Sequence, residues 1–253
     1  SHIEQYTSLN RVEINPFVIA FVIAIFSIVQ SLFGVGLLVF GTPTFLLLGF
    51  GYGEAVGYLL PSSLLLSILQ SSNFKDRIKI GRGIILYAVP FVFFGMMLSV
   101  EFGQHSYVTV MVGIIMLLLA LIRTINICKI FSTIKRFDRA FLVITGVVHG
   151  ISNQGGALLT ILMSSIYSDK EKVRTNIAFA YLLFGLSQLA LLLWIKAEVF
   201  SWTSIVYSMV TVISYKLVGE SLFRSVNIRM FNLIFTSFMF IYGLLLLVPT
   251  ILN

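Results

Sequence analysis

Long runs of apolar residues without charge dominate the chain and predict helices that cross a membrane. Such a helix needs about 20 residues to span about 30 Å of hydrocarbon at a rise of 1.5 Å per residue. The runs are continuous rather than alternating between apolar and polar positions, which favours helices over a transmembrane barrel. Six runs reach this length: residues 54–74, 83–100, 106–127, 175–195, 201–219 and 230–251.

Two further apolar regions are interrupted by glycine and polar residues. Residues 17–33 and 37–49 flank the sequence FGVG, and residues 138–152 and 157–167 flank the sequence NQGG. Glycine inside a helix costs about 1 kcal/mol relative to alanine. We therefore expect each region to form a pair of broken or re-entrant helices that meet at a break within the membrane.

The plan of the first half of the chain recurs in the second half. Gly36 in the first break and Gly155 in the second are 119 residues apart, and at that offset Ile25 falls on Ile144. Each half contains two short pieces, a break between them and then three long runs. Residues 16–127 and 138–251 are therefore predicted to be an internal duplication joined by a connector at 128–137.

The distribution of basic residues predicts how the halves are oriented. The loop after residues 54–74 carries four basic residues against Asp76, and the region from Arg123 to Arg139 is also basic, so both are predicted to be cytoplasmic. The same rule places each loop of the second half opposite its counterpart in the first. The halves are therefore predicted to be inverted repeats, with both termini extracytoplasmic.

These patterns define the expected fold class. We predict an all-α integral membrane protein of two inverted repeats, each a broken or re-entrant helix pair followed by three transmembrane helices, in one integrated transmembrane domain. Inverted repeats with discontinuous helices are the architecture of secondary transporters, which hold the substrate near the midplane where the repeats meet.

Composition excludes several other classes of protein. The chain is 58% hydrophobic and 11% charged, whereas about 25% of the residues in a soluble domain are charged. A soluble enzyme, a nucleic-acid-binding module and a disordered segment are therefore excluded. The net charge of +7 is explained by cytoplasmic lysine and arginine, so no nucleic-acid partner is expected.

The sequence contains no motif that indicates a cofactor or a metal site. A single cysteine, Cys128, rules out an internal disulfide and a multi-cysteine metal site. The sequence has no Walker-type loop and no cluster of metal ligands. We expect no cofactor, no metal and no ATP-driven transport by this chain alone.

The two breaks are the candidate substrate site. Helices that begin at Leu37 and Ala157 would direct backbone N–H groups, the positive ends of their dipoles, into the middle of the membrane, where they could bind an anion. Glycine allows a ligand to approach the backbone closely. The alternative is that these glycines only let helices pack tightly. The glycines concerned are Gly34, Gly36, Gly155 and Gly156.

Polar side chains near the breaks add to the candidate site. Gln30 and His149 occupy equivalent positions one turn before each break, and Asn153 and Gln154 lie within the second. His149 is a candidate proton carrier or anion ligand, or a neutral residue that bridges two helices. Gln70 and Gln188 recur late in the first long run of each half. They would either face the same cavity or form interhelical hydrogen bonds.

The motifs around the breaks resemble a known family. The sequence QSLFGVG at residues 30–36 leads through Pro43 to EAVG at 54–57, and HGISNQGG at 149–156 is followed by KVR at 172–174. Together they resemble the sulfite exporter TauE/SafE family, also called TSUP, over nearly the whole chain. The sequence departs from the family in lacking a full run of glycines at the first break and in lacking the second-half proline in the stretch from Leu158 onward.

The resemblance implies a permease for a small sulfur-containing oxyanion or organosulfonate, such as sulfite, sulfoacetate or thiosulfate. We expect alternating access in a bacterial inner membrane, with a proton or sodium ion as the candidate coupling ion and no enzymatic activity. An anion-conducting channel with the same hairpins is the alternative. An intramembrane enzyme would need a nucleophile and a base, for which only His149 and Ser152 come close. A scaffold subunit for another transporter is a third alternative.

Overall fold

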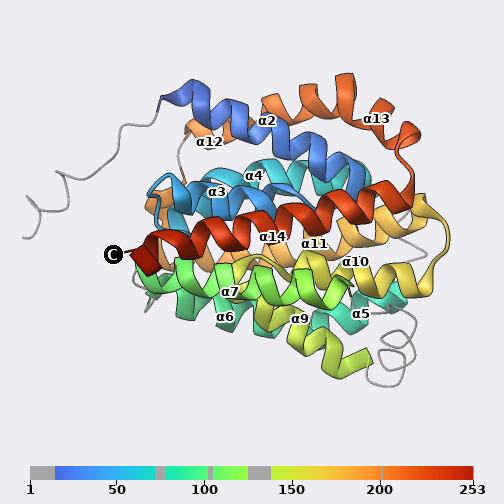
Figure 1. Ribbon diagram of the computed structural model, residues 1–253, viewed down its shortest axis with the longest axis horizontal. Helices are drawn as coiled ribbons and strands as arrows, with labels where there is room; N and C mark the ends of the chain where they lie inside the picture. The colour runs from blue at the N-terminus through green and yellow to red at the C-terminus, as the bar shows by residue number, and fades with distance from the viewer. Residues whose placement is uncertain (1–14, 72–77, 102–104, 125–137, 201, 253) are drawn as a thin grey trace, which may run out of the picture.

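The computed structural model describes most of the chain as a bundle of helices. The described residues are 15–71, 78–101, 105–124, 138–200 and 202–252. They form helices and no strands, and the helices lie side by side along one direction (Figure 1). The predicted connector at 128–137, with Cys128, lies outside the described residues. The predicted all-helical fold class is confirmed.

The helices follow the order that the apolar pattern predicts. The first half contains α2 (Pro16–Phe33), η1 (Leu37–Gly41), α3 (Thr42–Leu47), α4 (Tyr52–Gln70), α5 (Ile78–Tyr87), α6 (Val89–Glu101) and α7 (His105–Thr124). The second half contains α9 (Asp138–Ser152), α10 (Gly155–Ile166), α11 (Lys170–Ile195), η3 (Ala197–Val199), α12 (Trp202–Ser214), η4 (Tyr215–Gly219), α13 (Glu220–Ser225) and α14 (Ile228–Leu252). The segments η1 and η4 are π-helical, and η3 is a 3-10 turn.

Six of the helical segments are long and apolar enough to cross a membrane. One of them is α2, whose 18 residues reach spanning length although it precedes a break. The apolar helical pieces at 37–47, 139–152, 155–164 and 232–248 are shorter, so the predicted run at 230–251 is not among the six, although α14 as a whole is 25 residues long. Short helices on either side of the second break, and after the first, agree with the expectation of interrupted helices.

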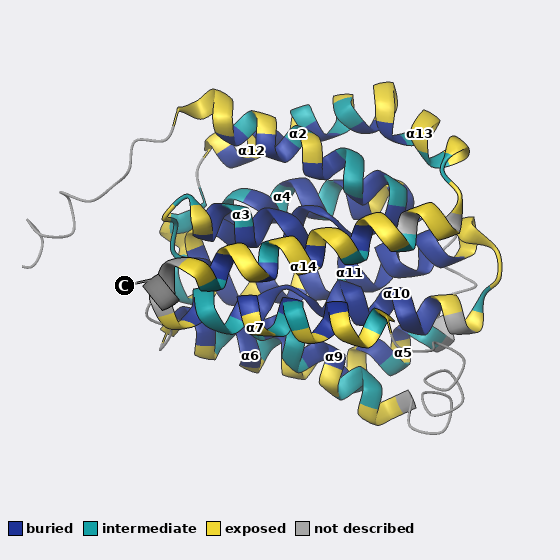
Figure 2. Ribbon diagram, in the orientation of Figure 1, coloured by how far each residue is buried: buried dark blue, intermediate teal, exposed yellow. Residues whose placement is uncertain are grey.

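The outer surface of the bundle is apolar. Trp202, Phe17 and Leu217 have exposed fractions of 83%, 82% and 73%, and Figure 2 shows exposed residues along the outer faces of α14 and α13. Soluble monomeric proteins rarely expose so much apolar surface to water. The outward side chains therefore face lipid, and the protein is an integral membrane protein.

Local sequence explains where the helices begin. Asn15 precedes α2, its side-chain oxygen accepts a hydrogen bond from the N–H of Phe17 (2.9 Å), and Pro16 starts the helix. Asp169 caps α11 in the same way by accepting from the N–H of Lys172 (2.8 Å). Both caps satisfy backbone donors that the first helical turn leaves unpaired.

Helices far apart in the sequence pack in pairs. α4 packs against α11, and α7 packs against α14. Likewise, α6 packs against α9, and α2 packs against α12. In Figure 1, α2 begins at the left end of the bundle, whereas α9 begins at the right end. The short elements η1 and α10 are in contact between these pairs, which brings the two breaks together.

Candidate functional site

The first break lies between α2 and η1 and depends on two glycines. Gly34 has a φ of 74°, a left-handed conformation, and its N–H donates to the carbonyl oxygen of Gln30 (2.8 Å), which ends α2. A Cβ atom on Gly34 would lie 2.6 Å from the carbonyl oxygen of Arg174 in α11. A Cβ atom on Gly36 would lie 2.5 Å from the backbone nitrogen of Gln30. Glycine at both positions lets the chain turn back against α2 and α11.

The second break is shorter than the sequence predicts. Only Asn153 and Gln154 separate α9 from α10, which begins at Gly155 rather than at the predicted Ala157. That prediction was wrong because the glycine pair adopts helical geometry and forms the first turn of α10. Among the described residues, Asn153 is the one non-glycine residue with a positive φ, 61°, a conformation that asparagine tolerates better than most residues.

The glycines of the second break allow α10 to contact its neighbours closely. A Cβ atom on Gly155 would lie 2.5 Å from Cβ of His149 in α9. A Cβ atom on Gly156 would overlap the hydroxyl of Tyr181 in α11 and lie 2.9 Å from Cγ1 of Val35 in the first break. Close packing, the alternative considered for these glycines, is present at both of them, and it brings the two breaks into direct contact.

Hydrogen bonds donated by side-chain amides hold the second break in place, two of them to the first half of the chain. Asn153 Nδ2 donates to Thr42 Oγ1 (2.8 Å), and Gln154 Nε2 donates to the carbonyl oxygen of Val39 (2.8 Å). Gln188 Nε2 in α11 donates to Asn153 Oδ1 (2.7 Å). All five residues are fully buried. The cluster therefore connects η1, α3, α10 and α11 at the centre of the bundle.

Gln30 organises the first break. Its Oε1 accepts from the N–H of Leu37 (3.2 Å), and its Nε2 donates to the carbonyl oxygen of Ser63 (3.2 Å) and to Ser67 Oγ (3.3 Å). Gln70 Nε2 donates to the carbonyl oxygen of Gln30 (3.1 Å). The N–H of Leu37, predicted to be free, is thus occupied by a side chain. An anion could reach it only if Gln30 moved aside.

His149 is buried among aromatic rings. Its ring centroid lies 5.0 Å from that of Tyr181 and 4.8 Å from that of Phe184. Neither imidazole nitrogen has a hydrogen-bond partner among the described residues, although the side chain of Gln188 lies beside the ring. The Oε1 atoms of Gln188 and Gln154 are also buried without a partner there. These unpaired polar atoms surround the second break.

All ten predicted site residues are buried, in two groups that contact each other. The first group is Gln30, Gly34, Gly36 and Gln70. The second group is His149, Asn153, Gln154, Gly155, Gly156 and Gln188. Asn153 and Gln154 connect the groups through Thr42 and Val39. Gln70 and Gln188 both form interhelical hydrogen bonds, which was one of the two roles expected for them.

Two tyrosines at the second break escaped the sequence analysis. Tyr52 donates to the carbonyl oxygen of Gly150 (2.9 Å), and Tyr181 donates to the carbonyl oxygen of Asn153 (3.4 Å). Both side chains are almost fully buried. Tyr181 offered a signal, because it lies inside a long apolar run, whereas membrane tyrosines are enriched at the interfaces.

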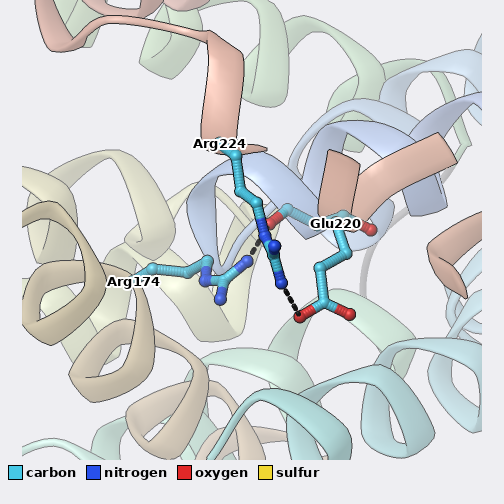
Figure 3. A network of polar contacts seen from close by, with 4 residues as sticks. Arg174, Glu220 and Arg224 are labelled. Atoms are coloured by element: carbon cyan, nitrogen blue, oxygen red, sulfur yellow. Dashed lines mark hydrogen bonds and ion pairs between the residues drawn. The ribbon is translucent and has the colours of Figure 1, made fainter. Parts of the chain in front are cut away.

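A buried arginine of α11 contacts the end of α2 at the first break. Arg174 Nη1 donates to the carbonyl oxygen of Ser31 (3.1 Å), and the guanidinium carbon lies 3.5 Å above the ring centroid of Phe223. Figure 3 shows Arg174 directed toward the end of α2, next to the Glu220–Arg224 ion pair (3.9 Å). Arg174 ends the KVR motif of the second half, and its hydrogen bond connects that motif to the end of α2 at the first break.

Ser152 and His149, the pair considered for nucleophilic chemistry, are not hydrogen-bonded to each other. Ser152 Oγ donates to the carbonyl oxygen of Val148 (2.6 Å) and accepts from the N–H of Gln154 (3.3 Å). It makes no hydrogen bond to His149, so a serine nucleophile activated by histidine is not formed here. The described residues also contain no group of three His, Cys, Asp or Glu side chains that could hold a metal ion.

Comparison with known proteins agrees with the architecture of the breaks. Residues 19–246, most of the chain, match the family described as Sulfite exporter TauE/SafE. No curated protein and no solved structure is significantly similar to the chain. The family consists of membrane transporters, not enzymes. The chain, with its interrupted helices and polar residues buried where they meet, belongs to the sulfite exporter TauE/SafE family.

Proposed function

We propose that the protein is a secondary transporter for a small sulfur-containing oxyanion or organosulfonate, such as sulfite, sulfoacetate or thiosulfate. It works by alternating access between two inverted halves in a bacterial inner membrane, with both termini outside the cytoplasm. The substrate binds between the two breaks, at Gly34, Gly36 and the residues of the Asn153–Gly156 segment. Gln30, His149, Gln70 and Gln188 support this site.

One observation carries the proposal. Both imidazole nitrogens of His149 and the Oε1 atoms of Gln154 and Gln188 are buried without partners among the described residues. Each such group costs about 1–3 kcal/mol relative to a hydrogen-bonded one, and a bound ion, a bound water or a functional role can account for that cost. A bound oxyanion with its associated water or proton would supply partners to the imidazole, and the two amides can rotate to offer N–H donors.

The pairing of helices supports the proposed inverted repeats. An offset of 119 residues exchanges α2 with α9, α4 with α11, α6 with α12 and α7 with α14. The contacts α4–α11 and α7–α14 map onto themselves, and α6–α9 maps onto α2–α12. This is the pattern expected of two similar halves related by a two-fold axis. The opposite ends at which α2 and α9 begin agree with it.

The closed contact between the breaks supports the proposal of alternating access. Asn153 and Gln154 bond directly to Thr42 and Val39, which leaves no space for an anion between these atoms. Binding therefore requires the halves to separate. A bound anion replaces the hydrogen bonds that are lost, and so stabilises the separated arrangement through its differential affinity. The same exchange from either side of the membrane would transport the anion.

His149 is the proposed coupling residue if a proton drives transport. It packs beside the second break from the last turn of α9, and an imidazole is a side chain that can carry a proton. A protonated imidazole beside the bound oxyanion would compensate its charge, so proton and anion would bind together. If sodium drives transport, carbonyl oxygens at the breaks are the candidate ligands.

Flux in reconstituted vesicles tests the proposal. Proteoliposomes with purified protein should take up labelled sulfite against its gradient when a proton or sodium gradient is imposed. Flux that ignores both gradients would identify a channel instead. Thermal-shift assays with sulfite, thiosulfate, sulfoacetate and sulfate would rank the substrates, because a ligand that binds the folded state stabilises it by mass action.

A matched pair of variants tests the site. Gln188→Leu removes the bond to Asn153 and should lower sulfite flux at least tenfold. The control Thr211→Val breaks a similar buried bond, Ser27 Oγ to Thr211 Oγ1 (3.0 Å), between α2 and α12, and should leave flux within twofold. Equal flux in both variants would show that the substrate site is not at the breaks. Absence of binding and flux for every sulfur anion would overturn the function itself.

A further inference from the structure

A cavity with several polar residues on its wall lies between α7, α10 and α14, at the end of the bundle where α7 and α10 finish. It has a volume of about 320 Å³ and is lined by Arg123, Thr160, Ser164, Lys170, Asn232 and Thr236, among others. A neighbouring cavity of about 570 Å³ shares Arg123, Asn232 and Thr236 and adds Arg229. None of the described acidic residues lines either cavity.

Arg123 is the centre of this cavity. Its Nη1 donates to Thr160 Oγ1 (2.6 Å), its Nη2 to Asn232 Oδ1 (2.9 Å) and its Nε to Thr236 Oγ1 (3.2 Å). The guanidinium carbon lies 4.7 Å from the ring centroid of Phe235. Every one of these partners is neutral. The side chain is therefore held rigidly in one direction while its positive charge is left without a carboxylate among the described residues.

This arrangement differs from that of an arginine that only reaches the membrane surface. Basic residues near helix ends commonly extend outward, so that the charge stays in water. Arg123 instead turns inward to α10 and α14, where it is half-buried. A partly desolvated charge without a counterion is costly, and an anion would relieve that cost. The guanidinium still has an N–H donor on Nη2 free for it, since the group carries five such donors.

The same short helix connects this cavity to the second break. α10 begins at Gly155, and the Nη1 atom of Arg123 also contacts the carbonyl oxygen of Ala157 (3.4 Å) in its first turn. Thr160 is five residues after Gly155, which corresponds to about 7.5 Å along a helix. An anion at Arg123 would therefore lie close to the break, on the side toward which α10 leads.

We propose that the Arg123 cavity is the docking site for the transported oxyanion at the cytoplasmic end of the protein. This inference rests on the proposed function. The site binds a small oxyanion such as sulfite through the fixed guanidinium and neighbouring hydroxyl groups, and delivers it to the breaks when the halves separate.

Two substitutions that are expected to change the stability of the protein differently test the site. Arg123→Gln removes the charge and should weaken sulfite binding about 10- to 100-fold. Asn232→Asp places a carboxylate next to Nη2, so it supplies the missing counterion. It should raise the melting temperature and yet weaken sulfite binding by a similar factor. Because this variant is expected to be more stable than the parent, its loss of binding cannot be attributed to misfolding.

The control is Arg224→Gln, which removes a basic residue on α13 that lines neither cavity. Arg224 is 79% exposed and pairs with Glu220 at the surface, and its loss should leave the sulfite affinity within twofold. Calorimetric titration of the detergent-purified protein with sulfite gives the affinities. If Asn232→Asp and Arg123→Gln both bind and transport sulfite like the parent protein, the docking site is wrong while the proposed function stands. If the parent protein binds no oxyanion, the proposed function fails as well.

Lipid phosphate shares the chemistry of an oxyanion and supplies a separate arm of the test. Adding phosphatidylglycerol to the detergent solution should leave the Asn232→Asp and parent proteins equally stabilised. If phosphatidylglycerol instead stabilises only the parent protein, and sulfite affinity is unaffected by Asn232→Asp, the cavity holds a lipid headgroup and the docking site is overturned.

Discussion

Replacing His149 with leucine should make the protein more stable and less functional. Leucine has nearly the volume of histidine and is a better helix former, so the substitution removes polar atoms without leaving a large cavity. In the structure, neither ring nitrogen of His149 has a hydrogen-bond partner among the described residues. The imidazole therefore destabilises the arrangement in which the breaks are in contact, and we expect it to have a role in binding the substrate.

The size of the effect follows from the contacts of the ring. A buried nitrogen without a partner costs about 1–3 kcal/mol, and the Gln188 side chain beside the ring offsets part of that cost for one of the two nitrogens. The aromatic contacts with Tyr181 and Phe184, at centroid separations of 5.0 and 4.8 Å, contribute roughly 0.5–1.5 kcal/mol each. The cost of the unpartnered nitrogens exceeds the stabilisation from the aromatic contacts. Removing both with His149→Leu should therefore raise the free energy of unfolding by about 1–3 kcal/mol. That corresponds to a shift in melting temperature of roughly 2–4 °C per kcal/mol for a chain of this size.

Thermal unfolding in detergent, with and without saturating sulfite, measures both consequences. His149→Leu should melt at a higher temperature than the parent protein and show no further shift with sulfite. The control Thr211→Val loses a satisfied bond and should melt at a lower temperature while it keeps the sulfite shift. A lower melting temperature for His149→Leu would refute the reasoning, because it would mean that the imidazole is hydrogen-bonded in the closed state.

Three further predictions concern the packing of the breaks. Gly34→Ala should lower the free energy of unfolding by more than about 1 kcal/mol in a denaturation experiment, because its φ is 74° and its Cβ would lie 2.6 Å from a carbonyl oxygen. Gly156→Ala should destabilise by about 1–3 kcal/mol through overpacking, and less when combined with Tyr181→Phe; additive melting shifts would contradict the predicted contact. Arg174→Lys should lower the melting temperature and the sulfite flux, since lysine loses the planar stacking on Phe223; a variant that matches the parent in both would rule out a supporting role.

The interrupted helices could be predicted because their signals are local. Each long run buries or exposes its own apolar side chains, and its length relative to the bilayer is visible in the sequence. Glycine likewise penalises a helix wherever it occurs, so the breaks at 34–36 and near 153–156 could be located to within a few residues. The error at Ala157 arose because contact with Tyr181 and His149 decides whether Gly155 and Gly156 join the helix.

The partners of the polar residues could not be predicted in this way. Asn153 and Thr42 are 111 residues apart, and their bond depends on how α10 and α3 are rotated and shifted relative to each other. The inward direction of Arg123 has the same origin, because the composition of α7 is compatible with either direction. The hydrogen bond from the Leu37 N–H to Gln30 Oε1 could not be predicted either, because it forms only where the chain turns back at Gly34.

The sequence alone determined that this protein spans a membrane with two broken helices, because hydrophobic length and glycine content act on each segment independently. Only the tertiary structure decided that the breaks touch, that His149 lies there without a partner and that Arg123 faces a cavity. These features depend on distances between helices remote in sequence, which are set by the packing of the whole bundle.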